Sequence, residues 1–90
     1  MAKVKFTTAL NRFFPDLKEI EVEGPTLNEV IKRTDEHFPG IKGYLLEEDG
    51  SLRKHVNIFI DEELVRDRKK LTDEVAGENE ILIFQALSGG

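Results

Sequence analysis

Hydrophobic and polar residues alternate along three stretches of the chain with the period of two that is typical of half-buried β-strands. The first two are residues 3–8 and 17–22, and the loop between them, residues 9–16, is broken by a proline. A single connecting loop predicts an antiparallel hairpin. The third stretch is residues 55–60. A fourth, residues 81–85, is apolar on both faces, which favours a central strand or one with a face covered by a partner.

One stretch follows the helical period instead, with apolar side chains and one threonine recurring on a single face: Leu27, Val30, Ile31, Thr34 and Phe38. Thr26 immediately precedes this stretch, and Glu29 lies three positions after Thr26, which is the spacing of an N-terminal capping box. Proline and glycine at positions 39 and 40 end the pattern. The sequence therefore predicts one main helix over residues 27–37.

Shorter elements are predicted between these stretches. Residues 41–46 are expected to pack as a short turn, residues 64–65 as a brief return strand, and residues 71–75 as a single helical turn. One main helix has to bury its apolar stripe against one face of the sheet. The order of elements therefore predicts a two-layer α+β domain.

The alternation also predicts an apolar patch on the open face of the sheet, away from the helix. The residues expected on or beside this patch are Phe59, Leu82, Phe84, Leu87 and Ser88. Contiguous apolar side chains on an exposed face mark interaction sites more often than scattered ones do. We therefore expect a partner protein to bind here, and the alternative is that loops or a second copy of the chain cover the patch.

Composition restricts the classes of function. Ninety residues make one domain, and 39% hydrophobic with 34% charged residues are typical of a folded globular protein. The net charge of -5 and the pI near 5.0 disfavour nucleic acids and anionic membranes as partners. The absence of cysteine excludes thiolate catalysis, disulfides and a Cys-based metal site. No apolar stretch is long enough for a signal peptide or a membrane span, so we expect a cytoplasmic protein.

The other polar residues are not predicted to form a site. His37 and His55 lack partners at metal-ligand or catalytic-triad spacing, so we expect no metal site. No glycine-rich phosphate loop is present, so the chain is not expected to bind ATP by itself. The basic run at residues 66–70 is interpreted as a solvated loop, with contact to acidic groups on a partner as the alternative.

The last five residues carry the candidate chemistry. Residues 1–85 are expected to form the domain, and residues 86–90 a flexible tail that ends in Gly89 and Gly90. Glycine lacks a Cβ, so this tail fits a channel too narrow for other residues, and Gly90 presents an α-carboxylate at its tip. Fully extended, the tail spans at most roughly 16–18 Å. That reach lets the carboxylate enter a partner's active site while the domain stays docked outside.

Two segments of the chain resemble a known family. Residues 55–66 contain a Val-Asn-apolar-aromatic-apolar hairpin that starts at Val56, and residues 77–90 place Gly-Gly right after the last strand. With the order of elements, these segments resemble the ubiquitin-like β-grasp sulfur carriers. That group includes the small subunit of molybdopterin synthase, the thiamine sulfur carrier and the sulfur carrier of a cysteine-making pathway. The resemblance covers essentially the whole chain and implies a β-grasp fold, with a mixed sheet of about four or five strands packed on one main helix.

The resemblance implies a carrier rather than an enzyme. A separate adenylating enzyme uses ATP and Mg²⁺ to convert the carboxylate of Gly90, which follows Gly89, into an acyl-adenylate. A sulfur nucleophile then displaces AMP and leaves a C-terminal thiocarboxylate, which delivers its sulfur inside an acceptor enzyme. The acceptor expected first is the large subunit of molybdopterin synthase, in molybdenum cofactor biosynthesis. Residues 85–88, Gln-Ala-Leu-Ser, lack the prolines of many molybdopterin-type members, so the branch of the family stays open.

The sequence leaves three other functions open. The first is that of a sulfur carrier in a pathway of cysteine synthesis, thiamine synthesis or tRNA thiolation. The second is that of a ubiquitin-like modifier, whose Gly90 forms an isopeptide bond with lysines of other proteins. The third function is that of a plain interaction module with an inert tail.

Overall fold

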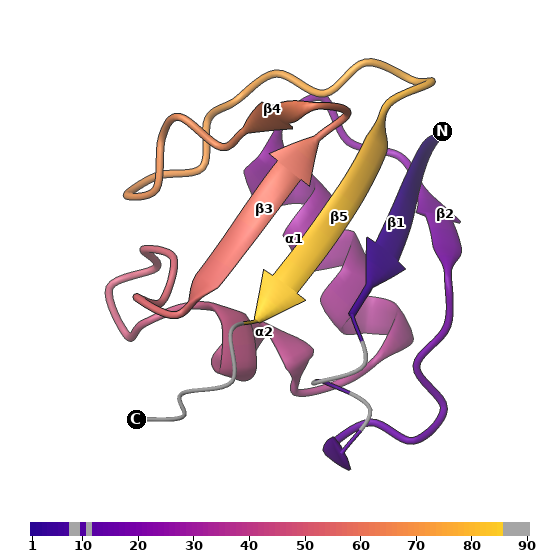
Figure 1. Cartoon of the computed structure of the whole chain (residues 1–90), viewed down its shortest axis with the longest axis vertical. Coiled ribbons are helices and arrows are strands. Elements are labelled where there is room, and N and C mark those ends of the chain that lie inside the picture. The colour runs from indigo at the N-terminus through magenta and orange to yellow at the C-terminus, as the bar shows by residue number, and fades with distance from the viewer. Residues whose placement is uncertain (8–9, 11, 86–90) are drawn as a thin grey trace.

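The computed structural model describes residues 1–7, 10 and 12–85. Its strands and helices, in chain order, are β1 (Ala2–Phe6), β2 (Ile20–Val22), α1 (Leu27–His37), α2 (Ile41–Leu45), β3 (Val56–Ile60), β4 (Glu63–Leu64) and β5 (Glu80–Gln85). The five strands form one sheet in the order β2-β1-β5-β3-β4, and α1 crosses behind it, so helix and sheet make two layers (Figure 1). The expected α+β fold with a mixed sheet and one main helix is confirmed.

The central place in the sheet belongs to β5, as its continuous apolar sequence predicts. It pairs in parallel with β1 on one side and antiparallel with β3 on the other. The predicted hairpin of β1 and β2 is antiparallel, and β4 forms the edge beyond β3. The last described residue, Gln85, lies opposite Val56 in the ladder. The end of β5 therefore lies beside the first residue of β3.

The core lies between α1 and the inner face of the sheet. Every second residue of β3 and β5 points into it, and the buried ones are Val56, Ile58, Ile81 and Ile83. Ile60 is half-buried against the same cluster. The residues that predicted the helical stripe are also buried: Leu27, Val30, Ile31, Thr34 and Phe38. The period of the hydrophobic pattern therefore assigned the inward faces of helix and strands correctly.

Truncation of Ile58 in this core is expected to lower the free energy of unfolding by about 2–5 kcal/mol, because Ile58→Ala loses buried methyl groups and leaves a cavity. Lys32→Ala, on the exposed side of α1, is the control, with an expected change within about 0.5 kcal/mol. Urea unfolding followed by circular dichroism measures both. A change below about 1 kcal/mol for Ile58→Ala contradicts the packing described here.

Local signals set both ends of α1. At the start, the backbone of Thr26 is extended and its Oγ1 accepts a hydrogen bond from the N–H of Glu29, with 3.4 Å between the two atoms. At the end, the N–H of Phe38 still donates to Thr34. Gly40 then takes a φ of 99°, a left-handed conformation that glycine adopts without a steric penalty. The predicted bounds of the helix therefore match the observed ones.

Several predicted elements differ from the structure. β3 begins at Val56 and β5 at Glu80, each one residue from its predicted start, and the turn expected over residues 41–46 is the short helix α2. The first strand begins at Ala2 and ends at Phe6, and position 8, its predicted end, lies outside the described residues. The second strand contains only Ile20–Val22, because its pairing with β1 ends where Val4 meets Ile20. The short return strand is shifted by one residue to Glu63–Leu64, because residues 61 and 62 alone make the turn. The helical turn predicted over residues 71–75 is wrong.

The carboxylate of Asp67 explains that last error. Its two oxygens accept hydrogen bonds from the backbone N–H groups of Lys69, Lys70 and Thr72. They also accept one from the Thr72 hydroxyl. The turn therefore lies at residues 68–70, where the N–H of Leu71 reaches back to the carbonyl of Asp67. Leu71 then takes a φ of 56°, which ends the turn instead of starting a helix.

Asp67 also makes the stability depend on pH. The Thr72 hydroxyl and then the Lys70 N–H lower its pKa from 3.8 to about 2. A lowered folded-state pKa means that the carboxylate stabilises the fold above pH 3.8, and that this contribution is lost as the pH falls through about 2. Carbon-13 NMR titration is expected to give a pKa of about 2 for this carboxyl group. The urea midpoint of the wild type should fall more between about pH 5 and about pH 2 than that of Asp67→Ala. Equal falls contradict this account.

Candidate partner-binding face and the base of the tail

The open face of the sheet carries a contiguous apolar patch. Phe59 on β3 lies opposite Leu82 on β5 and opposite Leu64 on β4, so the three side chains share one face. Phe84 follows Leu82 two positions later on that face. Phe84 and Leu64 expose 39% and 50% of their surface, while Phe59 and Leu82 are half-buried. We call Phe59, Leu64, Leu82 and Phe84 the open-face patch.

Three of these four residues were predicted from the alternation, and the structure brings them together. Leu64 was missed, because the return strand was placed one residue too late. The signal was present in the short turn: Asp61 and Glu62 alone connect Ile60 to Glu63, which puts Leu64 directly across from Phe59. The other predicted site residues, Leu87, Ser88, Gly89 and Gly90, lie outside the described residues.

The turn between β3 and β4 fixes the register of the patch. Asp61 has a φ of 56°, a left-handed conformation suited to a two-residue hairpin turn. Its carboxylate accepts a hydrogen bond from the N–H of Glu80 at 2.9 Å and another from the side-chain amide of Asn79. Its own N–H donates to the carbonyl of Glu80 at 2.7 Å. The turn is therefore tied to the start of β5, which keeps Leu82 opposite Phe59.

Charged groups border the patch on the β1 side. Lys5 lies opposite Leu82 in the parallel ladder, and its Nζ is 3.3 Å from a carboxylate oxygen of Glu80. Glu19 also lies within 4.0 Å of Lys5. These exposed ion pairs keep the β1 side nearly neutral and contribute little to stability. The apolar surface is therefore limited to β3, β4 and β5.

A second aromatic group lies outside this patch. Phe13 stacks on Tyr44 with ring centroids 4.8 Å apart, and Phe14 meets the same ring edge-on. Phe14 packs against the core, whereas Phe13 exposes half of its surface. Of these two adjacent phenylalanines, Phe14 therefore helps to close the core and Phe13 is exposed.

The described residues offer neither a metal cluster nor a membrane span. Over residues 1–7, 10 and 12–85, His, Asp and Glu side chains nowhere gather in threes at positions that could hold a metal ion. The helices of this part are too short and too polar to cross a membrane.

Comparisons with known proteins agree with this fold. A sequence model of the ThiS family matches residues 4–90. The sulfur carrier protein CysO of Mycobacterium tuberculosis is 29% identical over 89 residues, which are 97% of this chain and 96% of that protein. The CysO of Mycobacterium bovis matches equally well.

Solved structures give the same picture. A chain in the crystal structure of the Amycolatopsis orientalis BexX/CysO complex has a TM-score of 0.85 at 29% identity, with both chains fully covered. Mycobacterium tuberculosis CysO has a TM-score of 0.83 at 27% identity, over 97% of this chain and 100% of that one. SAMP1 from Haloferax volcanii shares the fold, with a TM-score of 0.77 at 21% identity over 99% and 98% of the two chains. The chain described here belongs to the ThiS family of ubiquitin-like β-grasp sulfur carriers.

Proposed function

We propose that this protein is a sulfur carrier whose Gly90 carboxylate is adenylated by a separate enzyme and then converted to a thiocarboxylate. The observation that carries the proposal is the family match over residues 4–90, which includes both terminal glycines. The chemistry follows from the group at the end of the tail. A carboxylate is a poor electrophile, and transfer of AMP from ATP with release of pyrophosphate gives it a good leaving group. A sulfur nucleophile then attacks the carbonyl carbon, and AMP departs: sulfide gives the thiocarboxylate directly, whereas a persulfide gives an acyl disulfide whose S–S bond a thiol then reduces.

The domain supplies recognition in this scheme, and the partner supplies the catalytic groups. The open-face patch lies on the strand from which the tail departs, since Phe84 immediately precedes Gln85, the last residue of β5. A partner that covers the patch therefore sits beside the base of the tail. Holding the domain there makes the attack of the carboxylate on ATP effectively intramolecular, which is worth many orders of magnitude in effective concentration. ATP and Mg²⁺ act in the partner, and this chain contributes the carboxylate.

For the acceptor, we propose the cysteine-making branch of the family. The support is that the curated relatives are CysO carriers that match nearly the whole chain. The molybdopterin branch, expected first from the sequence, is the second candidate and has no comparable support among these relatives. Sulfur transfer to an acceptor enzyme distinguishes the two branches, because the acceptor of the correct branch consumes the thiocarboxylate and the acceptor of the other branch does not.

The test uses purified thiocarboxylated chain with each acceptor in turn. With a serine activated at its hydroxyl, a cysteine synthase from the same organism is expected to consume the thiocarboxylate within minutes: the sulfur bonds to the serine Cβ as the activating group leaves, and the carboxylate returns only when the resulting acyl bond is hydrolysed. The large subunit of a molybdopterin synthase, given its own substrate, is expected to leave the thiocarboxylate unchanged. The reverse result assigns the molybdopterin branch and overturns the acceptor proposed here. In the same organism's extract, Gly90 joined to lysines of other proteins would favour the modifier function instead.

A further inference from the structure

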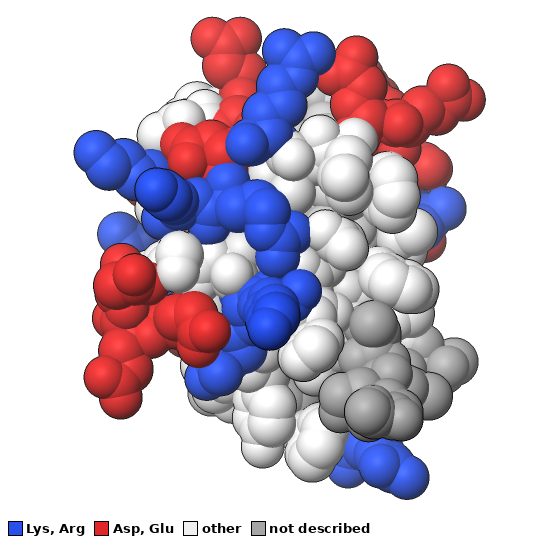
Figure 2. All heavy atoms as spheres, turned by 60° about the vertical axis from the view of Figure 1, so that its left-hand side comes forward, with Lys and Arg blue, Asp and Glu red and all other residues white. Residues whose placement is uncertain are grey.

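Four cations that form no ion pair within the described part of the chain gather at the outer edge of β3. Arg53 and Arg66 in the same region pair with Glu47 at 3.1 Å and with Glu63 at 3.5 Å. The other basic residues in this region are Lys54, Arg68, Lys69 and Lys70. None of them forms an ion pair with another described residue. We call these four residues the basic edge. In Figure 2, Lys and Arg side chains form a band between an uncharged area and acidic side chains.

Arg68 is the fixed part of the basic edge. Its Nη1 donates to the side-chain oxygen of Asn57 at 2.6 Å, and its Nη2 donates at 2.8 Å to the carbonyls of both Arg53 and Val56. All three acceptors are neutral, so they hold the half-buried guanidinium in place without cancelling its charge. Its Nε–H has no acceptor among the described residues and is free to donate to an anion.

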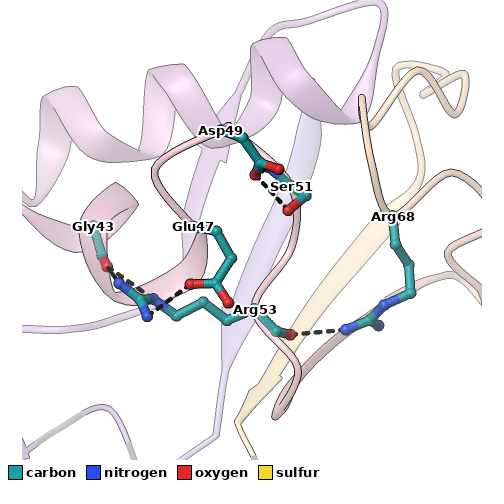
Figure 3. Close-up of polar contacts among 6 residues, drawn as sticks. All are labelled: Gly43, Glu47, Asp49, Ser51, Arg53 and Arg68. Carbon is teal, nitrogen blue, oxygen red and sulfur yellow. Dashed lines mark hydrogen bonds and ion pairs between the residues drawn. The ribbon is translucent and has the colours of Figure 1, made fainter.

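The fold explains why an arginine occupies this place. The short strand β4 pairs only with the last two residues of β3, so the carbonyl of Val56 has no strand partner on this side. The guanidinium of Arg68 supplies the missing donor. The loop that carries the Arg53 carbonyl is fixed in position, because the Arg53 guanidinium donates to the carbonyl of Gly43 at 2.9 and 3.1 Å and to Glu47 (Figure 3). The position of the Arg68 charge is therefore fixed by β3 and by two loops, the one that contains Arg53 and the one that contains Arg68 itself.

The basic edge is continuous with the open-face patch and with the base of the tail. Asn57, which binds Arg68, lies opposite Phe84, and Val56 lies opposite Gln85. Lys69 and Lys70 follow Arg68 in the turn around Asp67, where their backbone groups make the hydrogen bonds, including one that the Lys70 carbonyl accepts from the Asn28 side chain, and their side chains are exposed. A partner seated on the patch therefore meets these cations at its margin.

The net charge of the protein decides what kind of anion fits. A chain with a net charge of -5 repels nucleic acids and anionic membranes at long range, so a local basic edge suits a few carboxylates on a protein surface. We propose that the basic edge binds acidic side chains of the adenylating enzyme, with Arg68 as its anchoring residue, while the patch fills an apolar site on the same enzyme. The identity of this partner rests on the proposed function.

The test compares two charge reversals of equal size. Lys69→Glu/Lys70→Glu changes the basic edge, and Lys18→Glu/Lys32→Glu changes two exposed lysines that also form no ion pair among the described residues. Calorimetry gives the Kd for the adenylating enzyme at about 0.05 M and about 0.3 M NaCl. We expect the edge pair to weaken binding about tenfold at low salt and to reduce the salt dependence, and the control pair to change Kd less than about twofold.

Arg68 is tested by Arg68→Gln and Arg68→Lys, with thermal melting as a check on folding. Loss of the charge in Arg68→Gln should raise Kd about tenfold, while Arg68→Lys keeps the charge and should raise it about threefold. Because Arg68 also bridges two loops, the lysine pair tests the proposal even where Arg68→Gln unfolds.

Equal effects of the two lysine pairs would overturn the inference, and so would a wild-type Kd that is indifferent to salt. Failure of the proposed function looks different, because binding is measured apart from conversion. A chain that binds the enzyme with the expected salt dependence and never gains sulfur refutes the carrier function and leaves the basic edge supported. A wild-type chain that does not bind the enzyme overturns both.

Discussion

Deletion of Gly90 is expected to abolish formation of the thiocarboxylate while leaving the fold unchanged. The deletion withdraws the carboxylate by one residue, roughly 3.5 Å, from the position that the full tail reaches. Misplacement of a reacting group by about 1 Å already costs about a hundredfold in rate, so we expect kcat/KM for adenylation to fall at least that far. Pyrophosphate release with the adenylating enzyme measures the effect. Binding of the domain should change less than about threefold, since the patch is intact.

Gly90→Ala is the matched variant for this deletion, because it restores the reach of the tail and adds only a Cβ. We expect it to bind normally and to be adenylated more slowly than the wild type, since a narrow channel excludes the added methyl group. Lys32→Ala, on the far side of the molecule, should behave as the wild type. Full activity of the chain that ends at Gly89 would show that the reacting carboxylate need not be that of Gly90.

Phe84→Asp is expected to raise the KM of the adenylating enzyme for this chain at least about thirtyfold, with kcat changed by less than about threefold. Phe84 exposes 39% of its surface on the open face, so a carboxylate there costs the free domain little and places a charge in the apolar centre of the interface. The same steady-state assay separates KM from kcat, and thermal melting verifies the fold.

Phe13→Asp is the control for Phe84→Asp. Phe13 is also an exposed aromatic residue, at 50%, but it stacks on Tyr44 outside the open-face patch. Its KM should stay within about threefold of the wild type. Equal losses in the two variants would argue against the patch as the docking surface. Sedimentation of the wild type tests the alternative that a second copy of the chain covers the patch, which predicts a dimer.

The sequence predicted those parts of the fold that short-range signals determine. The bounds of α1 follow from the cap at Thr26 and the left-handed Gly40, both within a few residues of the helix ends. The inward faces of β3 and β5 follow from alternation, which also placed Phe59, Leu82 and Phe84 on the open face. These features need no knowledge of which segments pair.

The remaining features depend on partners that are distant in sequence. The turn at residues 68–70 is the exception, since Asp67 lies next to it in sequence and its hydrogen bonds to the backbone N–H groups were not recognised. The start of β2 at Ile20 is set by where its pairing with β1 stops, at Val4. The role of Arg68 was missed for the same reason: its acceptors lie 11 to 15 positions earlier in the chain, in a loop and on β3. The sequence shows a basic run. It does not show that the hydrogen-bond acceptors of Arg68 are neutral groups, which leave the charge of Arg68 without an ion-pair partner among the described residues.

The measurement that tests the carrier function most directly is the intact mass of the purified chain after incubation with an adenylating enzyme from the same organism, ATP, Mg²⁺ and a sulfur donor. Replacement of one oxygen by sulfur at Gly90 predicts a gain of about 16 Da, absent without ATP and absent in the chain that ends at Gly89. An unchanged mass, with the enzyme active on another carrier, would contradict the carrier function and leave an interaction module with an inert tail.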